Sequence, residues 1–209
     1  MEGGKKTERD RMLEEGKLAL DFANTVDWHA SDHPEESLHR YEDLVAWGLK
    51  AGTVSSDEAS ALRRSAAREP EVAGAILEQA RALREVIYRI FAGVAGDRAP
   101  DPSDLAALNA ALGDALPHLA LAPESGGFAW VWRETGGALE RVLWPVAKSA
   151  AVLLTSDVLD RVRQCADENC GWLFLDMSKN RSRRWCDMKS CGNRAKARRY
   201  YARQHAATS

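Results

Sequence analysis

The fold of this 209-residue chain is decided near its end, by C-A-D-E-N-C at residues 165–170 and C-D-M-K-S-C-G-N-R at residues 186–194. These segments hold all four cysteines of the sequence, as two C-x4-C pairs separated by fifteen residues. Each pair can close a short chelate loop, and the spacer can bring the pairs together around a tetrahedral ion. Cys165, Cys170, Cys186 and Cys191 are therefore predicted to bind one structural Zn²⁺ ion.

Two other uses of four cysteines compete with zinc. Disulfides need an oxidising compartment, but the charged N-terminus has no apolar signal-peptide segment. An iron–sulfur cluster also takes four cysteines, although this spacing is not the usual ferredoxin one. Four thiolates leave zinc no open position for water, so the predicted ion is structural, and its site carries a net charge of about −2. Arg183, Arg184 and Arg194 are expected to lie near this negative charge.

The residues around the cysteines predict a small zinc fold similar to a treble clef. Residues 172–175 (WLFL) and 183–185 (RRW) have the composition of two short strands around the polar segment 176–182, and residues 194–205 favour a helix. The last cysteine would then precede the helix, where the helix dipole favours a thiolate.

Charge is distributed very unevenly along the chain. The formal net charge is only −2, yet residues 177–209 carry ten Lys and Arg against one Asp, or +9, which leaves −11 on residues 1–176. A basic tail on an acidic body is expected to contact a polyanion. The residues predicted to bind nucleic acid are Arg181, Arg183, Arg184, Arg194, Lys196, Arg198, Arg199 and Arg203.

The predicted last helix presents its cations in two rows, when successive residues are placed about 100° apart. The first row consists of Arg194 and Arg198, and the second of Lys196, Arg199 and Arg203. Alanines lie between the rows, which would allow close approach to a phosphate backbone or the major groove. Tyr200 and Tyr201 lie on the remaining side, which is expected to pack against the zinc module.

The rest of the chain predicts a mostly helical domain with one small β-hairpin. Its composition is globular, with 45% hydrophobic and 29% charged residues and a mean hydropathy of −0.41. Helices are expected at 38–49, 56–68, 71–95, 103–117 and 138–154, the last kinked or divided at Trp144-Pro145, and a hairpin at 120–132. The domains are then a disordered, charged extension (1–15), a helical domain (16–156) and a zinc module (157–209), which is docked because no Gly/Ser-rich linker precedes it.

Several of these segments carry a resemblance to known families. W-L-F-L-D (172–176), S-K-N (178–180), R-W-C (184–186) and above all C-G-N-R (191–194) resemble the CGNR zinc finger. L-A-L-D-F-A-N-T-V-D-W (18–28) and A-L-R-E-V-I-Y-R-I-F (82–91) are similar to the ABATE domain that usually precedes it in stress-induced transcription regulators. Together the resemblances to the two domains cover nearly the whole chain, and they imply a DNA-binding regulator.

The sequence therefore predicts a cytoplasmic transcription regulator whose basic helix contacts DNA and whose helical domain senses an effector or dimerises. A single zinc module buries little DNA surface, so a homodimer on two half-sites is expected. One alternative is RNA binding, with bases stacked on Trp172, Trp185 or Tyr201. Another is pairing of the basic helix with an acidic partner, or with the acidic body of its own chain.

A small-molecule site is predicted at Asp21, Asn24 and Arg84, because an arginine within an apolar stripe needs an anionic partner. A salt bridge between Asp21 and Arg84 would remove the reason for a ligand there. No catalytic activity is predicted, since the sequence has no Gly-rich phosphate loop, G-x-S-x-G or H-E-x-x-H. No apolar run approaches the roughly 18 residues of a membrane span.

Overall fold

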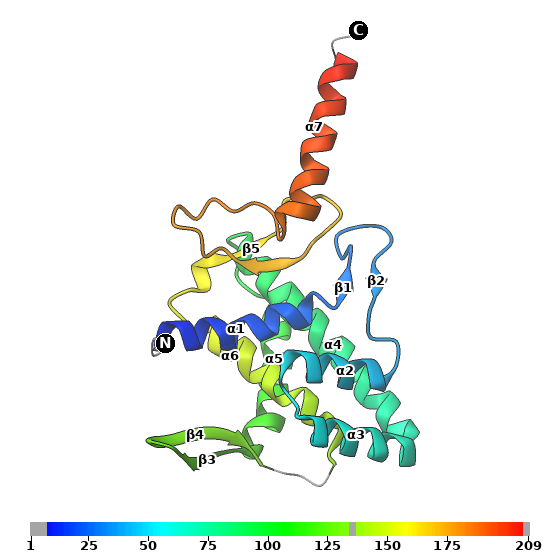
Figure 1. The fold of residues 1–209 in the computed structure, drawn as a ribbon, viewed down its shortest axis with the longest axis vertical. Coiled ribbons are helices and arrows are strands. Elements are labelled where there is room, and N and C mark those ends of the chain that lie inside the picture. Colours follow the sequence, from blue (N-terminus) through cyan, green and yellow to red (C-terminus); the bar gives the residue numbers. More distant parts are fainter. Residues whose placement is uncertain (1–7, 134–136, 207–209) are drawn as a thin grey trace.

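The structure, a computed structural model, describes residues 8–133 and 137–206, and it consists of a helical body that carries the cysteine-rich module at one end (Figure 1). The helices of the body are α1 (Glu8–Ala23), α2 (Tyr41–Ala51), α3 (Ser56–Arg68), α4 (Pro70–Ala95), α5 (Pro102–Ala115) and α6 (Trp144–Leu154), with 3-10 turns η1 (Leu116–His118), η2 (Leu139–Val142) and η3 (Leu159–Arg161). Three antiparallel strand pairs are β1 (Val26–Asp27) with β2 (Glu35–Glu36), β3 (Leu119–Glu124) with β4 (Gly127–Trp132), and β5 (Val162–Gln164) with β6 (Leu173–Leu175). The π-helical turn η4 (Met188–Gly192) leads into α7 (Asn193–Ala206).

The predicted fold class is confirmed, because the chain is mostly helical with small hairpins and a C-terminal four-cysteine cluster. Helix α4 lies at the centre, where Leu77, Ile87 and Phe91 of its predicted apolar stripe are buried in the main core. Helix α3 spans the predicted residues and begins with a capping box one residue before the expected start. The hydroxyl of Ser55 accepts the Glu58 N–H at 3.2 Å, and the Glu58 carboxylate accepts the Ser55 N–H at 2.7 Å.

The helix predicted over 138–154 is divided at the predicted proline. Turn η2 ends at Val142, and Pro145 is the second residue of α6, where its missing N–H removes no helical hydrogen bond. Two helical segments therefore meet at Trp144 without a kink inside either one.

The disordered extension predicted for residues 1–15 is wrong for residues 8–15, because α1 begins at Glu8; residues 1–7 lie outside the described part of the chain. The end of α1 is firmly packed, since Ala19, Leu20 and Phe22 are buried and the Ala19 N–H donates to the Ser149 hydroxyl at 2.8 Å. A helix anchored in this way extends through a preceding charged segment, because Glu and Arg are good helix formers.

The zinc module differs from its prediction in the pairing of its strands. Strand β6 lies within the predicted segment 172–175, but its partner is β5, ahead of the first cysteine, and residues 183–185 form no strand. The Asp176 carboxylate accepts the N–H groups of Ser178 and Arg183 at 2.9 and 2.8 Å. These bonds turn the chain and remove residues 183–185 from the sheet.

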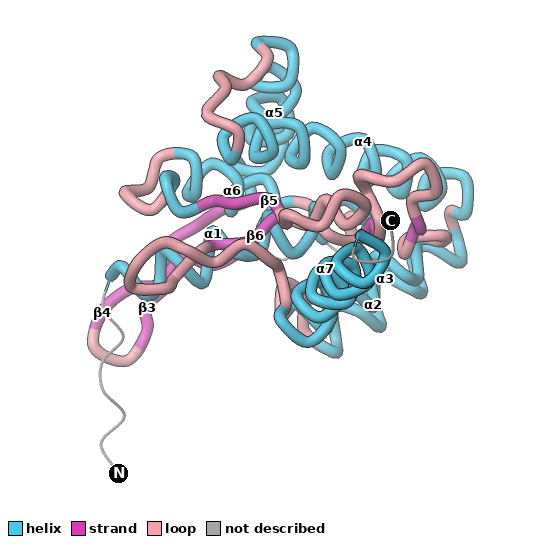
Figure 2. Tube along the Cα trace, turned by 90° about the horizontal axis from the view of Figure 1, so that it is seen from above, coloured by secondary structure: helices cyan, strands magenta, loops and turns pink. Residues whose placement is uncertain are grey.

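The module is docked on the body, as the absence of a linker predicted. Val158, Val162 and Leu173 belong to the main hydrophobic core, and β5 and β6 lie beside α4 and α1 (Figure 2). Asn24, at the end of α1, donates its amide to the Leu173 carbonyl at 2.8 Å and accepts the Leu173 N–H at 2.9 Å. A side chain of the body thus completes the backbone hydrogen bonding of a strand in the module.

Substituting Asn24 with alanine should destabilise the fold by about 2 kcal/mol, because it removes two hydrogen bonds and leaves the buried polar groups of Leu173 without partners. Urea unfolding followed by tryptophan fluorescence measures this loss. Asn109→Ala, at an exposed position of α5, is the control and should change stability little. Equal stability of the two variants would show that the Asn24 contact does not hold the module in place.

Candidate metal centre and basic helix

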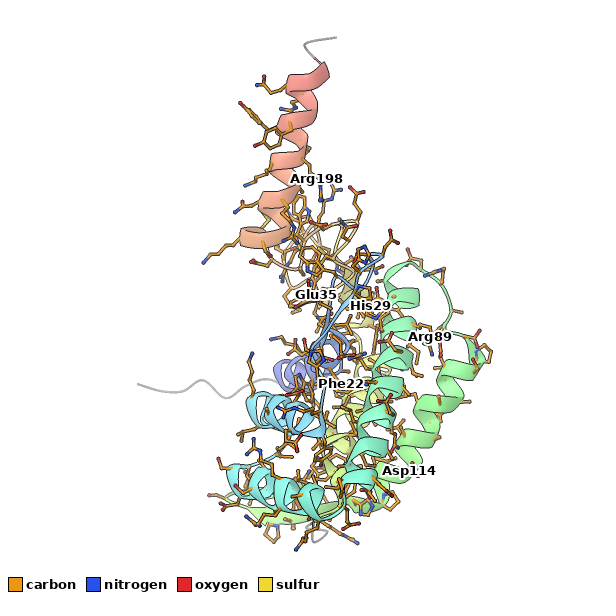
Figure 3. The ribbon with its side chains drawn as sticks, turned by 90° about the vertical axis from the view of Figure 1, so that its right-hand side faces the viewer. Phe22, His29, Glu35, Arg89, Asp114 and Arg198 are labelled. Carbon is orange, nitrogen blue, oxygen red and sulfur yellow. The ribbon has the colours of Figure 1, made fainter. Side chains whose placement is uncertain are left out.

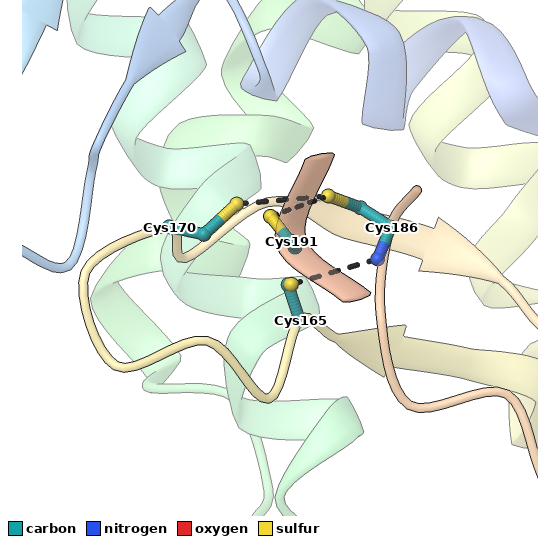
Figure 4. A group of neighbouring side chains, drawn as sticks. All are labelled: Cys165, Cys170, Cys186 and Cys191. Carbon is teal, nitrogen blue, oxygen red and sulfur yellow. Dashed lines mark hydrogen bonds between the residues drawn. The ribbon is translucent and has the colours of Figure 1, made fainter. Parts of the chain in front are cut away.

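The four cysteine sulfurs converge at the end of the body (Figure 4). All lie within 4.8 Å of one another, and the Sγ of Cys186 is 3.6 Å from that of Cys170 and 3.5 Å from that of Cys191. A tetrahedral zinc ion with Zn–S bonds of about 2.3 Å places its sulfurs about 3.8 Å apart. The four thiols form no disulfide, and their spacing fits one such ion.

Local backbone structure positions the first cysteine pair. Cys165 follows β5, with its N–H donated to the Trp172 carbonyl at 2.8 Å, and Cys170 precedes β6. Gly171, which follows Cys170, has a φ of +71° and lies close to the body. A Cβ at this position would lie 2.8 Å from the Ala30 nitrogen and 2.9 Å from the Tyr88 hydroxyl. Glycine is therefore required where the metal loop approaches the body.

The second pair is held by hydrogen bonds and a helix start. The Cys186 N–H donates to the Cys165 sulfur at 3.5 Å, and the Asp187 carboxylate caps η4 by accepting the Ser190 N–H at 3.0 Å. Cys191 lies in η4 directly before α7, as predicted for a cysteine at a helix N-terminus. The helix dipole there favours the thiolate form.

In the absence of a bound metal ion, hydrogen bonding and burial shift the pKa values of two of the thiols in opposite directions. Hydrogen bonding with Cys186 lowers the pKa of Cys170 to about 6, while burial raises the pKa of Cys191 to about 11. Arg194 donates from Nη2 to the Cys191 sulfur at 2.9 Å, so one of the three arginines predicted near the sulfurs contacts a sulfur directly. Arg183 donates to the carbonyls of Trp185 and Cys186 instead.

The first basic row of α7 is paired within the chain. Asp167, in the first cysteine loop, has a side chain only 1% exposed, and it accepts Arg194 Nε at 3.2 Å and lies 3.3 Å from Arg198 Nη2. Burial opposes its ionisation, but the hydrogen bond from Arg194 and the charge of Arg198 hold the pKa of Asp167 below its usual value. Arg194 and Arg198 therefore fix the direction in which α7 leaves the metal centre.

Asp167 was not among the residues predicted from the sequence. The available signal was an acid within a C-x4-C loop, facing a helix whose charges are all basic.

The second basic row is exposed. Lys196, Arg199 and Arg203 make no ion pair with the described residues, and Arg199 donates only to the Ala195 carbonyl at 3.2 Å. Helix α7 extends away from the body, with Arg198 near its base (Figure 3). The three cations therefore share one face of a projecting helix, where Arg199 also lies over the Trp185 ring, 6.0 Å from its centroid.

The predicted packing of Tyr200 and Tyr201 on the zinc module is wrong, because both are exposed on α7, where their rings meet edge to face. The aromatic residues of the module already have other partners. Trp172 donates its indole N–H to the Val26 carbonyl at 3.2 Å, and the Trp185 ring lies beneath the guanidinium of Arg184 at 5.4 Å.

The other basic residues predicted to bind nucleic acid lie in the loop before η4. Arg181 pairs with Asp160, Arg183 lies over the Phe174 ring, and Arg184 makes no ion pair with the described chain.

The three residues of the predicted ligand site do not converge. Asp21 is exposed and lies 3.7 Å from Lys17, and Asn24 binds β6. Arg84, with a side chain only 5% exposed, binds both carboxylate oxygens of Glu36 at 2.7 Å and Glu85 at 3.1 Å. Its anionic partners are thus Glu36 and Glu85, and ligand binding at this site stays an untested prediction.

Replacing Glu36 with glutamine should cost about 3 kcal/mol, because it leaves the buried Arg84 without its bidentate partner. Burial opposes ionisation, but hydrogen bonds from Arg84 hold the pKa of Glu36 below its usual value. The stabilisation is therefore present at neutral pH and is lost as the pH falls through this lowered pKa. Urea unfolding at pH 7 measures the loss, with the exposed neighbour Glu35→Gln as control; equal midpoints for the two variants would contradict the prediction.

The body also contains a cavity that the sequence did not suggest. It has a volume of about 660 Å³ and lies between α4, α5 and α6, with mostly apolar walls. Asp114 and Glu140 contribute carboxylates to its lining, and neither makes an ion pair within the described chain. The His118 ring stacks on Trp144 with centroids 4.0 Å apart.

Comparison with protein-family models assigns both parts of the chain. Residues 16–157 match ABATE, described as a putative stress-induced transcription regulator, over more than half of the sequence. The chain belongs to the ABATE family. In this ABATE protein, residues 161–204 also match the CGNR zinc finger, a range that contains all four clustered cysteines. The cluster is thus a zinc site for one Zn²⁺ ion, in preference to an iron–sulfur cluster.

Neither matching family is a family of enzymes. No curated protein matches the ABATE protein. Among its described helices, none is both long enough and apolar enough to cross a membrane.

Proposed function

We propose that this ABATE protein regulates transcription by placing Lys196, Arg199 and Arg203 of α7 on the phosphates of duplex DNA. The observation that carries the proposal is the division of the basic helix into two rows. Arg194 and Arg198 are neutralised by Asp167 and the zinc thiolates, whereas the second row has no acidic partner among the described residues, and its Arg199 lies against the Ala195 carbonyl and the Trp185 ring. Exposed cations on a fixed scaffold are suited to contacting a phosphate backbone.

This division reconciles two of the sequence-based predictions. Pairing of the basic helix with an acidic residue of its own chain, Asp167 of the first cysteine loop, accounts for Arg194 and Arg198, and nucleic-acid contact is left to the second row. Arg184, which also has no ion pair in the described chain, is suited to extend the same contact from the loop before η4.

Fluorescence anisotropy of the zinc-loaded protein with a mixed-sequence duplex at about 50 and 200 mM salt tests the proposal. Affinity that falls steeply with salt is expected, because phosphate contacts release counterions. Absence of binding at both salt concentrations, with zinc content and helicity intact, would overturn the proposal.

RNA or single-stranded DNA is the second candidate, and exposed Tyr200 and Tyr201 favour it. They extend beside the second basic row, where unpaired bases could stack on them. Of the aromatic residues predicted for stacking, Tyr201 is exposed, whereas Trp172 and Trp185 have protein partners. Competition experiments with labelled duplex DNA separate the two candidates. If an unlabelled single strand displaces the labelled duplex far more effectively than an unlabelled duplex does, single-strand binding is favoured.

The remaining parts of the proposal concern the oligomeric state, an effector of the helical body and the cellular compartment. Two copies are expected to act together, since one zinc module covers too little DNA for tight specific binding. The helical body would sense a small effector, for which the cavity between α4, α5 and α6 offers a suitable volume. A DNA-binding protein that keeps four thiols reduced would act in the cytoplasm, and no catalytic step is needed for this function.

A further inference from the structure

The β3–β4 hairpin carries strongly exposed apolar and aromatic side chains, among them Phe128 and Trp130. It projects sideways from the body in both views (Figures 1 and 2). Its register pairs Leu119 with Trp132, Leu121 with Trp130 and Pro123 with Phe128. Residues directly opposite one another share a face of an antiparallel pair, as do alternate residues along a strand. One face of the hairpin, here called the apolar face, therefore consists of these six residues.

Most of the apolar face is in contact with solvent. Phe128 is 75% exposed, Trp130 is 62% exposed and Leu121 is 61% exposed. Only the base of the hairpin is covered, where the Trp132 ring lies 6.0 Å from that of Trp144. The three exposed side chains alone present about 400 Å² of apolar surface, a patch size that in a monomer commonly marks an interaction site.

The hairpin also lacks the support that a two-stranded sheet needs. Within the part of the chain that the structure describes, strands β3 and β4 pair only with each other, which leaves both outer edges open. An isolated two-stranded hairpin is marginally stable in water, and further strands or a packed face stabilise it. A partner surface on the apolar face would supply that packing.

We infer that the apolar face is the dimer interface of the protein and that its occupant is the same face of a second copy. Charge supports this choice. The hairpin has one charged residue, Glu124 beside the turn, whereas residues 1–176 together carry −11. Two acidic bodies repel each other, so contact is least opposed where the surface is uncharged. A two-fold axis through the hairpins buries apolar residues against their own counterparts and leaves no charge unpaired.

The area sets the expected strength of this dimer. Two apolar faces in contact bury about 800 Å² from their three most exposed side chains, which is less than the roughly 1,200 Å² of a typical stable interface. Pro123 and the covered residues at the base add to this area. A reversible dimer that dissociates on dilution in the micromolar range is therefore expected. The inference rests on the proposed function only for its expectation of two copies.

Sedimentation equilibrium of the zinc-loaded full chain, without DNA, tests the inference independently of DNA binding. The wild type should approach twice its mass of 23.0 kDa as concentration rises through the micromolar range. Trp130→Glu places a charge in the centre of the apolar face and should remain a monomer. Val72→Ser, which removes an exposed apolar side chain from α4, should dimerise like the wild type.

Far-UV circular dichroism and zinc content confirm that each variant is folded before the masses are compared. Phe128→Ser, a milder change on the same face, should weaken the dimer at least tenfold without adding charge. A monomeric wild type over the whole range, or a Trp130→Glu variant that dimerises as well as the wild type, would overturn the inference.

Discussion

Removal of the zinc ion by a chelator is expected to lower the melting temperature of the whole protein by about 10 °C and to abolish DNA binding. Without the ion, Cys165, Cys170, Cys186 and Cys191 lose their common partner, and zinc-binding free energy is lost from folding. The effect reaches the body, because Val162 and Leu173 of the module are buried in the main core. Burial of two such side chains contributes about 3–5 kcal/mol, which corresponds to about 10 °C for a chain of this size.

Differential scanning calorimetry and anisotropy of the same samples measure both effects. Zinc should restore the melting temperature of chelated protein but not that of Cys191→Ser, which lacks one ligand. Far-UV circular dichroism should retain most of its helical signal at 25 °C, because α1 to α6 lie outside the module. An unchanged melting temperature after complete zinc removal would mean that the body folds independently of the metal site.

Replacing Lys196, Arg199 and Arg203 together with glutamine is expected to remove most of the salt dependence of DNA binding. Three fewer phosphate contacts reduce the slope of log affinity against log salt by about 2.7. Between 50 and 200 mM salt, the wild type should therefore lose about 40-fold more affinity than the variant. Glutamine keeps good helix propensity, so α7 should be preserved.

A charge-matched control separates specific contact from the change in net charge. Lys50, Arg63 and Arg64 are exposed on α2 and α3, and replacing them with glutamine removes the same charge from the body. The control should keep the salt slope of the wild type, as measured by anisotropy. Equal slopes for the two triple variants would refute contact by the second row.

The sequence predicted features that depend on local patterns. Cysteine spacing predicted the four-cysteine cluster, the segment that begins at Ser56 predicted the start of α3 one residue after the observed cap at Ser55, and Pro145 marked the break before α6. Each of these signals acts over a few residues, so it can be read without knowledge of the tertiary fold.

The features that the sequence did not predict depend on contacts between distant segments. Asp167 neutralises one row of α7 because the metal brings residues 165–170 beside residues 194–198. Pairing of β6 with β5 instead of residues 183–185 follows from hydrogen bonds to Asp176. Glu36 reaches Arg84 only when β2 packs beside α4, and helical periodicity could not indicate this pairing.

The Asn24–Leu173 contact bears on how the protein can evolve. The two family matches adjoin between residues 157 and 161, so the sequence alone suggests two separable domains. The folded chain cannot be separated there without loss of stability. Leu173 of β6 depends on the body both for its hydrogen bonds with Asn24 and for the apolar residues that bury its side chain. A recombination event that moved residues 161–204 to another host would transfer the metal ligands and leave a polar backbone and Leu173 uncovered. The two segments are therefore expected to be inherited as one unit, with substitutions at position 24 and along β6 constrained together.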